Sequence, residues 1–181
     1  MARYQNIGVF LSAREGLDTT YIHATREVGE WIGTSGRTLV YGGSACGLME
    51  VLAEAVKRTG GNVVGIVPRI ITERGLESKY MNRAIPCHDL AERKALLTRE
   101  SDILLALPGG IGTLDELFTV LGEVAIGLPT AKSLVLYNAC GIWNGLIGVL
   151  DELHRQGFLR HNYRDHLFVV NNIAELQALL S

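Results

Sequence analysis

The stretch ILLALPGGIGTLDEL, residues 103–117, indicates the fold class, because it combines a buried strand, a glycine turn and the start of a helix. Residues 103–106 are apolar throughout, which is typical of a strand covered on both faces of a parallel sheet. Pro108 ends the strand, and the glycines after it allow a tight turn with outward-pointing N–H groups. A helix is predicted over 114–126, with a buried apolar stripe formed by Leu114, Leu117, Phe118, Leu121, Val124 and Ala125.

The same alternation of short apolar runs and segments of helical period continues along the chain. Strands are predicted at residues 7–11, 38–41, 63–67, 83–86, 103–106, 133–137 and 167–170. Helices are predicted at residues 20–34, 48–59, 90–101, 114–126, 143–156 and 173–180. The linking segments are long enough for helical crossovers between parallel strands. The sequence therefore predicts one α/β domain over residues 1–181, a Rossmann-like, doubly wound parallel sheet with helices on both faces.

The composition excludes several classes of protein. Of the 181 residues, 48% are hydrophobic and 20% are charged, and the formal net charge is −2. This balance is typical of a globular protein and offers no basic surface to a nucleic acid polymer or an anionic membrane. Three cysteines without a CxxC pair predict free thiols in a reducing, cytoplasmic setting, and the apolar start is too short for a signal peptide. The histidines lack metal-ligand spacing, so no metal is expected, and no sequence feature indicates another cofactor.

A second glycine-rich turn, VYGGSACGLME at residues 40–50, also follows a strand and opens a helix. Neither turn fits the dinucleotide fingerprint GxGxxG, because Ser44 and Asp115 replace required glycines, and the chain has no Gly-Lys pair for a Walker A loop. N–H groups at the start of a helix can still bind a phosphate monoester without a cation. The alternative is that the glycines only make tight turns. Two such turns at one sheet edge favour phosphate binding, and the irregular residues 68–78 are expected to lie over the site.

Two charged residues near the first turn have a structural and a functional interpretation. The sequence TLDE matches a capping box, with Thr113 as the N-cap and Glu116 as the third helical residue. Arg93 lies on the same helical face as several leucines, so its guanidinium needs an anion unless it extends to solvent or forms a structural ion pair. The helix of Arg93 leads into the strand at 103–106, which lets Arg93 approach the turn. Arg93, Glu116 and a phosphate nest would together make a site.

The segments that contain Arg93 and Glu116 resemble the signatures of a known family. ERKALLTRESD (92–102), followed by ALPGGIGTLDE (106–116), resembles the RK and PGGxGTxxE signatures of the lonely-guy (LOG) family, the cytokinin riboside 5′-monophosphate phosphoribohydrolases. Members of this family have often been labelled lysine decarboxylases. The similarity runs nearly the full length of the chain, since IGVFLSA (7–13), YGGSACGLM (41–49) and GNVVGIVP (61–68) resemble further family segments. The paired signatures at this spacing are specific, whereas either alone would be weak.

The resemblance implies hydrolysis of the N-glycosidic bond of a purine nucleoside 5′-monophosphate, of cytokinin type or adenosine monophosphate, to free base and ribose 5-phosphate. It assigns the catalytic pair to Arg93 and Glu116. It also implies a homodimer whose two subunits shape the active-site region. The residues that would bind the substrate and its phosphate are Ser12, Gly43, Ser44, Lys94, Gly109, Gly110, Ile111, Gly112 and Thr113.

The chemistry of bond cleavage agrees with this assignment. Breaking the bond between ribose C1′ and the base builds positive charge on the sugar. The Glu116 carboxylate can stabilise that charge or activate water, and a place in the first helical turn would favour its ionised form. Arg93 can neutralise the departing base, or it can hold Glu116 and the substrate in register. The residues leave both roles open.

Departures from the family pattern leave the base preference open. The first turn reads LSAR at residues 11–14, so that Ser12 alone matches the usual CGSS, and Ile111 replaces a frequent tyrosine. The main alternative is a nucleotide or molybdenum-cofactor carrier of the same fold that hydrolyses nothing. A decarboxylase that uses pyridoxal phosphate is a weaker alternative, since no segment marks a Schiff-base lysine.

Overall fold

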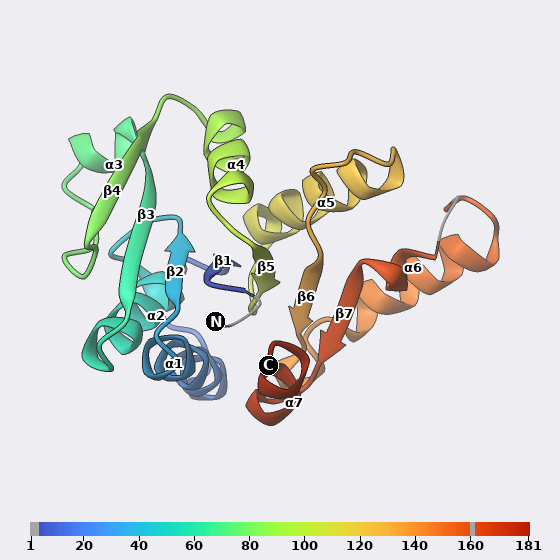
Figure 1. The fold of residues 1–181 in the computed structure, drawn as a ribbon, viewed down its shortest axis with the longest axis horizontal. Coiled ribbons are helices and arrows are strands. Elements are labelled where there is room, and N and C mark those ends of the chain that lie inside the picture. Colours follow the sequence, from blue (N-terminus) through green and yellow to red (C-terminus); the bar gives the residue numbers. More distant parts are fainter. Residues whose placement is uncertain (1–3, 160–161) are drawn as a thin grey trace.

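The structure, a computed structural model, describes residues 4–159 and 162–181. Within these residues the strands form one seven-stranded sheet in the order β4-β3-β2-β1-β5-β6-β7, and all neighbouring strands are parallel (Figure 1). Every predicted strand is present, so the α/β, doubly wound fold is confirmed. The strands are β1 (Asn6–Phe10), β2 (Thr38–Tyr41), β3 (Asn62–Pro68), β4 (Arg83–Cys87), β5 (Ile103–Ala106), β6 (Leu134–Tyr137) and β7 (Leu167–Val170).

Helices cover both faces of this sheet. They are α1 (Thr19–Thr34), α2 (Gly47–Arg58), α3 (Arg69–Glu73), α4 (Leu90–Arg99), α5 (Ile111–Ala125), α6 (Asn144–Arg155) and α7 (Ile173–Leu179), with 3-10 turns at Ala139–Gly141 and Tyr163–Asp165. Side chains of α1, α2 and α7 pack into one buried apolar cluster, and those of α4, α5 and α6 pack into a second. Strand β5 separates them, because its alternate residues belong to opposite clusters. Figure 1 shows α1 and α7 below the sheet and α4 and α5 above it.

The chain changes winding direction between β1 and β5, which are neighbours in the sheet. β1 leads to α1 on one face, and β5 leads to α5 on the other. Beyond the strands the two turns stay in contact, because the Ser12 N–H donates to the Pro108 carbonyl at 3.2 Å. Ligands of doubly wound folds bind at such a switch point, beyond the carboxyl ends of the strands. The glycine turn after β5 therefore lies where this architecture places a ligand.

Three details of the prediction are wrong. Helix α5 begins at Ile111, three residues before the predicted start, with Gly110 in the N-cap position. The predicted apolar stripe of α5 is only partly buried: Leu117 is 0% exposed, whereas Phe118 is 46% exposed and Ala125 lies at the surface. Residues 68–78, predicted as irregular, contain α3. Backbone hydrogen bonds join the end of this segment to the second glycine turn.

A buried arginine joins the two ends of the described chain. Arg37, only 7% exposed, donates from Nε to the Tyr4 carbonyl (3.1 Å) and from Nη2 to the Leu180 carbonyl (2.8 Å). Its guanidinium also stacks on the Trp31 ring, 4.8 Å from the centroid. Removing it would leave two carbonyls of the buried clamp without their charged donor.

We expect Arg37→Met to lower the free energy of unfolding by about 3 kcal/mol, since hydrogen bonds to charged groups contribute more than neutral ones. Urea denaturation measures the change. The matched control is Arg58→Met, at the exposed end of α2, which should stay within about 0.5 kcal/mol of the parent. Equal stability of the two variants would show that the clamp contributes nothing.

Candidate active site

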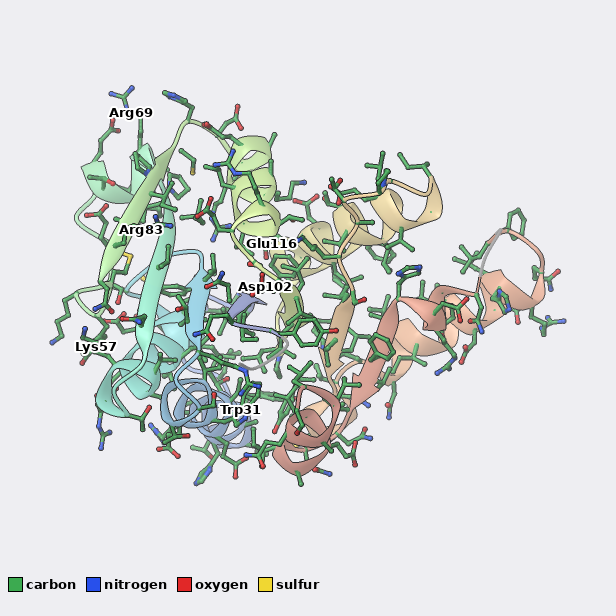
Figure 2. All side chains as sticks on the ribbon, viewed as in Figure 1. Trp31, Lys57, Arg69, Arg83, Asp102 and Glu116 are labelled. Carbon is green, nitrogen blue, oxygen red and sulfur yellow. The ribbon has the colours of Figure 1, made fainter. Side chains whose placement is uncertain are left out.

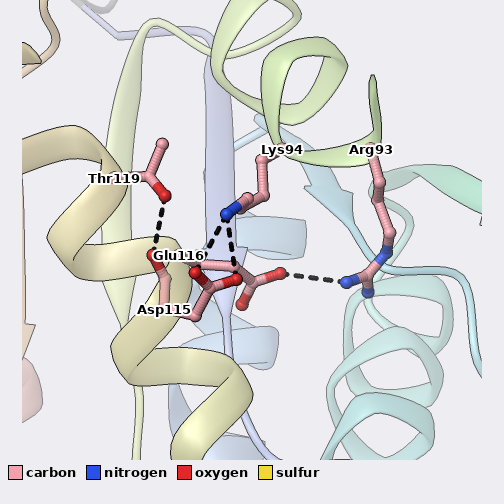
Figure 3. Close-up of polar contacts among 5 residues, drawn as sticks. All are labelled: Arg93, Lys94, Asp115, Glu116 and Thr119. Atoms are coloured by element: carbon pink, nitrogen blue, oxygen red, sulfur yellow. Dashed lines mark hydrogen bonds and ion pairs between the residues drawn. The ribbon is translucent and has the colours of Figure 1, made fainter. Parts of the chain in front are cut away.

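The centre of the site is an ion pair between α4 and α5. The Arg93 Nη1 donates to Glu116 Oε1 at 3.0 Å, and the two side chains are 14% and 7% exposed. Figure 2 shows Glu116 where α4 and α5 meet, and Figure 3 shows Arg93 reaching toward it from α4. The sequence predicted that Arg93 approaches this region, and it does. Its burial excludes extension into solvent and leaves an ion pair with a carboxylate.

Arg93 also contacts the second glycine turn. A Cβ placed on Gly42 would stand 1.7 Å from Arg93 Nη2, so the guanidinium lies directly against the backbone of this turn. The buried Nε of Arg93 has no hydrogen-bond partner among the described residues. A buried guanidinium with an unused donor is suited to an acceptor on a ligand. The sequence did not indicate that Gly42 provides the space for Arg93, because no local pattern links residues so far apart.

Glu116 is not part of a capping box, contrary to one prediction. Because α5 begins at Ile111, Thr113 is its third residue and Glu116 lies in the second turn. The expectation that a first-turn position favours the ionised carboxylate is wrong for the same reason. Instead, desolvation by burial raises the pKa of Glu116 to about 7, and the nearby charge of Arg93 offsets part of this rise. Such a carboxyl group changes its protonation near neutral pH, as general acids and bases do.

The turn after β5 exposes the N-terminal end of α5. Gly110 precedes the helix and carries no side chain, so no side chain of this residue caps the first N–H groups. Gly110 and Gly112 face open space, because beyond the adjacent backbone no described atom lies within 4 Å of a Cβ placed there. Gly109, in contrast, packs so closely on Thr113 that its Cβ would stand 2.0 Å from Thr113 Oγ1. The turn is therefore closed on one side by Thr113 and open to an anion on the other.

The other predicted phosphate and substrate residues lie around these turns. Ser12 borders the β5 turn, and its hydroxyl accepts a hydrogen bond from the Arg14 N–H. Gly43 has a positive φ of 72°, and its carbonyl accepts from the Ser78 N–H at 2.9 Å. Ser44 is buried, and Ile111, at the start of α5, is 82% exposed. Phosphate or substrate binding by these residues stays a prediction.

Lys94 has a partner that the sequence did not indicate. Its Nζ lies 2.9 Å from both carboxylate oxygens of Asp115, the residue before Glu116 (Figure 3). In the sequence, Asp115 was notable only because it replaces a glycine that the dinucleotide fingerprint requires. The signal for this contact was present, because Lys94 and Asp115 directly flank the two residues of the predicted pair.

Within residues 4–159 and 162–181, no three His, Cys, Asp or Glu side chains come together as a metal site would require. Among the helices described, none is long and apolar enough to cross a membrane.

Comparisons with known proteins agree with the sequence signatures. A family model described as "Possible lysine decarboxylase" matches residues 49–180. The cytokinin riboside 5′-monophosphate phosphoribohydrolase LOG5 of Arabidopsis thaliana is 34% identical over 168 residues, covering 93% of this chain and 73% of the relative. The probable cytokinin riboside 5′-monophosphate phosphoribohydrolase LOGL2 of Oryza sativa subsp. japonica is 32% identical, covering 93% and 68%.

Solved structures share the fold. A molybdenum cofactor binding protein from Rippkaea orientalis superposes with a TM-score of 0.74 at 21% identity, covering 98% of this chain and 95% of the other. The Moco carrier protein from Chlamydomonas reinhardtii gives a TM-score of 0.70 at 23% identity, with the same coverage. At this identity the likeness concerns the fold alone.

Proposed function

This chain belongs to the LOG family, and from that premise we propose that it hydrolyses the N-glycosidic bond of a purine nucleoside 5′-monophosphate. The products are the free base and ribose 5-phosphate. The observation that carries the proposal is the buried Arg93–Glu116 pair, 3.0 Å apart, next to the open glycine turn. A turn for the phosphate and a carboxylate for the sugar are the two elements that this reaction requires.

In this proposal each element of the site has one task. The N–H groups at the start of α5 bind the phosphate, and this remote contact positions C1′ for reaction. The ionised Glu116 stabilises the positive charge on the ribose, or removes a proton from the attacking water. The bond from C1′ to the base nitrogen breaks, the oxygen of water bonds to C1′, and a proton ends on the base. Arg93 holds Glu116 through Nη1 and has Nε free among the described residues for the substrate.

The decisive experiment is an assay for free base. Adenosine 5′-monophosphate, a cytokinin riboside 5′-monophosphate and unphosphorylated adenosine are each incubated with the protein, and the products are separated by chromatography. Release of base from a monophosphate, with a much lower kcat for adenosine, supports the proposal, because the phosphate contact contributes to the transition state. Binding of several purine monophosphates without base release would instead favour a carrier.

We expect kcat/KM to fall as the pH drops below about 7. In the free protein the pKa of Glu116 is raised to about 7, and the proposed reaction needs the carboxylate. A single required ionisation gives a loss of about tenfold per pH unit below the midpoint. The rate of base release, measured from pH 5 to 9 at low substrate concentration, tests this. A midpoint near 4.5 would mean that burial does not control the reacting carboxyl group.

The resemblance also implies a homodimer, and we propose that α5 and α6 form the contact with a second copy. Between these helices lies an apolar groove of about 540 Å³. Several of its lining side chains are large, apolar and exposed: Phe118 by 46%, Ile126 by 74% and Phe158 by 76%. An apolar face of this kind is typical of an oligomer interface. Its position on α5, the helix of Glu116, supports the implied role of both subunits at the site.

We expect Phe118→Asp to convert a dimer into a monomer, because a charge in the centre of an apolar contact has no partner there. Size-exclusion chromatography with light scattering measures the mass. Leu179→Asp on α7 is the matched control, since Leu179 is 36% exposed on the opposite face of the sheet. A parent protein that is monomeric at high concentration would contradict the dimer.

A further inference from the structure

Helices α4 and α5 are joined by two ion pairs made by consecutive residues. Arg93 pairs with Glu116, and Lys94, the next residue on α4, pairs with Asp115, the preceding residue on α5 (Figure 3). In the second pair, both carboxylate oxygens of Asp115 accept from the Lys94 Nζ, each at 2.9 Å. Two adjacent contacts between the same helices restrict both sliding and rotation of one helix against the other.

We propose that Lys94 and Asp115 are a positioning pair that holds Glu116 against Arg93 and balances opposite charges beside it. This inference rests on the proposed function, and it assigns Asp115 a role that the family resemblance does not give it. In the free protein the ammonium group of Lys94 is directed at Asp115. Its first task is therefore within the protein, before any substrate is bound.

The side-chain exposure of the two ion pairs indicates that Lys94–Asp115, the outer pair, contributes little to the stability of the fold. Asp115 is 55% exposed and Lys94 22% exposed, whereas the inner pair is almost buried. Ion pairs at such exposed positions contribute only about 0.2–1 kcal/mol to folding. The outer pair instead fixes the positions of Arg93 and Glu116, because Lys94 and Asp115 are joined to them by peptide bonds. The Asp115 carbonyl is fixed as well, since it accepts from the Thr119 hydroxyl at 2.8 Å.

The electrostatic arrangement around Glu116 agrees with a balancing role. The charged groups that act on its carboxyl are Arg93 and Lys94 from α4 and Asp115 from α5. From the β2–α2 turn, Gly42 lies against Arg93 and brings no charge. Asp115 raises the pKa of Glu116, and Lys94 lowers it. The effects of Asp115 and Lys94 on the pKa of Glu116 oppose each other, so that burial and Arg93 determine this pKa.

The experiment compares Asp115→Asn, Lys94→Met and the double variant Lys94→Met/Asp115→Asn with the parent. The titration of the Glu116 carboxyl carbon is followed by NMR in the free protein, with Glu116→Gln identifying the signal. We expect Asp115→Asn to move the midpoint to lower pH and Lys94→Met to move it to higher pH. The double variant should return close to the parent, because both opposing charges are gone. Midpoints that move in neither single variant would contradict the balancing role of the pair, and the kinetics distinguish a positioning role from a structural one.

Kinetics with adenosine 5′-monophosphate provide the second readout. At the pH optimum of each variant we expect kcat to fall about tenfold in both single variants and in the double variant, with little change in KM, because the alignment of Glu116 is lost. Lys94→Arg keeps the ion pair and should retain most of the parental kcat. Thermal melting of each variant shows that the fold is intact.

Several outcomes would overturn the inference. A rise in KM for Lys94→Met, with Asp115→Asn unchanged in every measurement, would make Lys94 a substrate contact and Asp115 a solvated side chain. Midpoints that move in the same direction in both single variants would also contradict it. Failure of the proposed function is a separate result, since a parent that releases no base still shows the Glu116 titration in the free protein.

Discussion

Glu116→Gln is expected to reduce base release from a purine nucleoside 5′-monophosphate by about 10³-fold, because a neutral amide cannot act as a carboxylate. The substitution keeps the size of the side chain and an oxygen that accepts from Arg93 Nη1, so the contact between α4 and α5 can persist. The loss should appear in kcat, since the charge on the sugar develops only in the transition state. Chromatographic measurement of free base over time tests this.

The control for Glu116→Gln is Glu123→Gln, two turns further along α5. It makes the same chemical change outside the Arg93 contact and should retain the parental kcat. A lost helix cap cannot explain inactivity at position 116, because α5 begins at Ile111 and Glu116 caps nothing. If Glu116→Gln kept full turnover, the Arg93–Glu116 pair would be a structural ion pair, and the catalytic assignment would be wrong.

Gly42→Ala is expected to lower kcat/KM by about 10²-fold, a size of loss that a misplacement of about 1 Å can cause. The new Cβ would stand 1.7 Å from Arg93 Nη2, and 3.2 Å from Met49 Cε. The atom that must move is the end of a flexible side chain, so the fold should survive while Arg93 is displaced from its place beside Glu116. Kinetics and a thermal melt of the same sample separate these two effects.

The control for this substitution is Gly148→Ala. Gly148 lies on α6, and beyond the adjacent backbone of that helix no described atom is within 4 Å of its added Cβ. Activity should stay at the parental level, and a glycine-to-alanine change inside a helix should raise stability by up to about 1 kcal/mol. Full activity of Gly42→Ala would mean that Arg93 does not need its position against the turn.

The strands could be predicted to within one or two residues because each is a short apolar run between polar or glycine-rich segments. β2, β5 and β7 have the predicted bounds. The start of α5 could not be predicted in the same way. The sequence TLDE imitates a capping box, whereas the helix already includes Ile111 and Gly112, because a glycine turn can enter a helix without a side-chain cap.

Of the candidate site, the nearness of Arg93 to the glycine turn could be predicted from the order of the elements. Its contact with Gly42 could not, because residues 42 and 93 belong to different βα units and meet only through tertiary packing. The contact of Lys94 with Asp115, 21 residues apart in sequence, was open to prediction, because these two residues flank Arg93 and Glu116. The exposure of Phe118 was missed because helical spacing identifies an apolar face without identifying what covers it.

One helix, α5, begins with the glycine turn, carries Glu116 in its second turn and lines the apolar groove further along. Subunit association through that groove would therefore act on the same helix that carries the Glu116 carboxylate. Specific activity would then vary with protein concentration, falling on dilution as protomers separate. The same polypeptide assayed at nanomolar and at micromolar concentration would then give different turnover numbers.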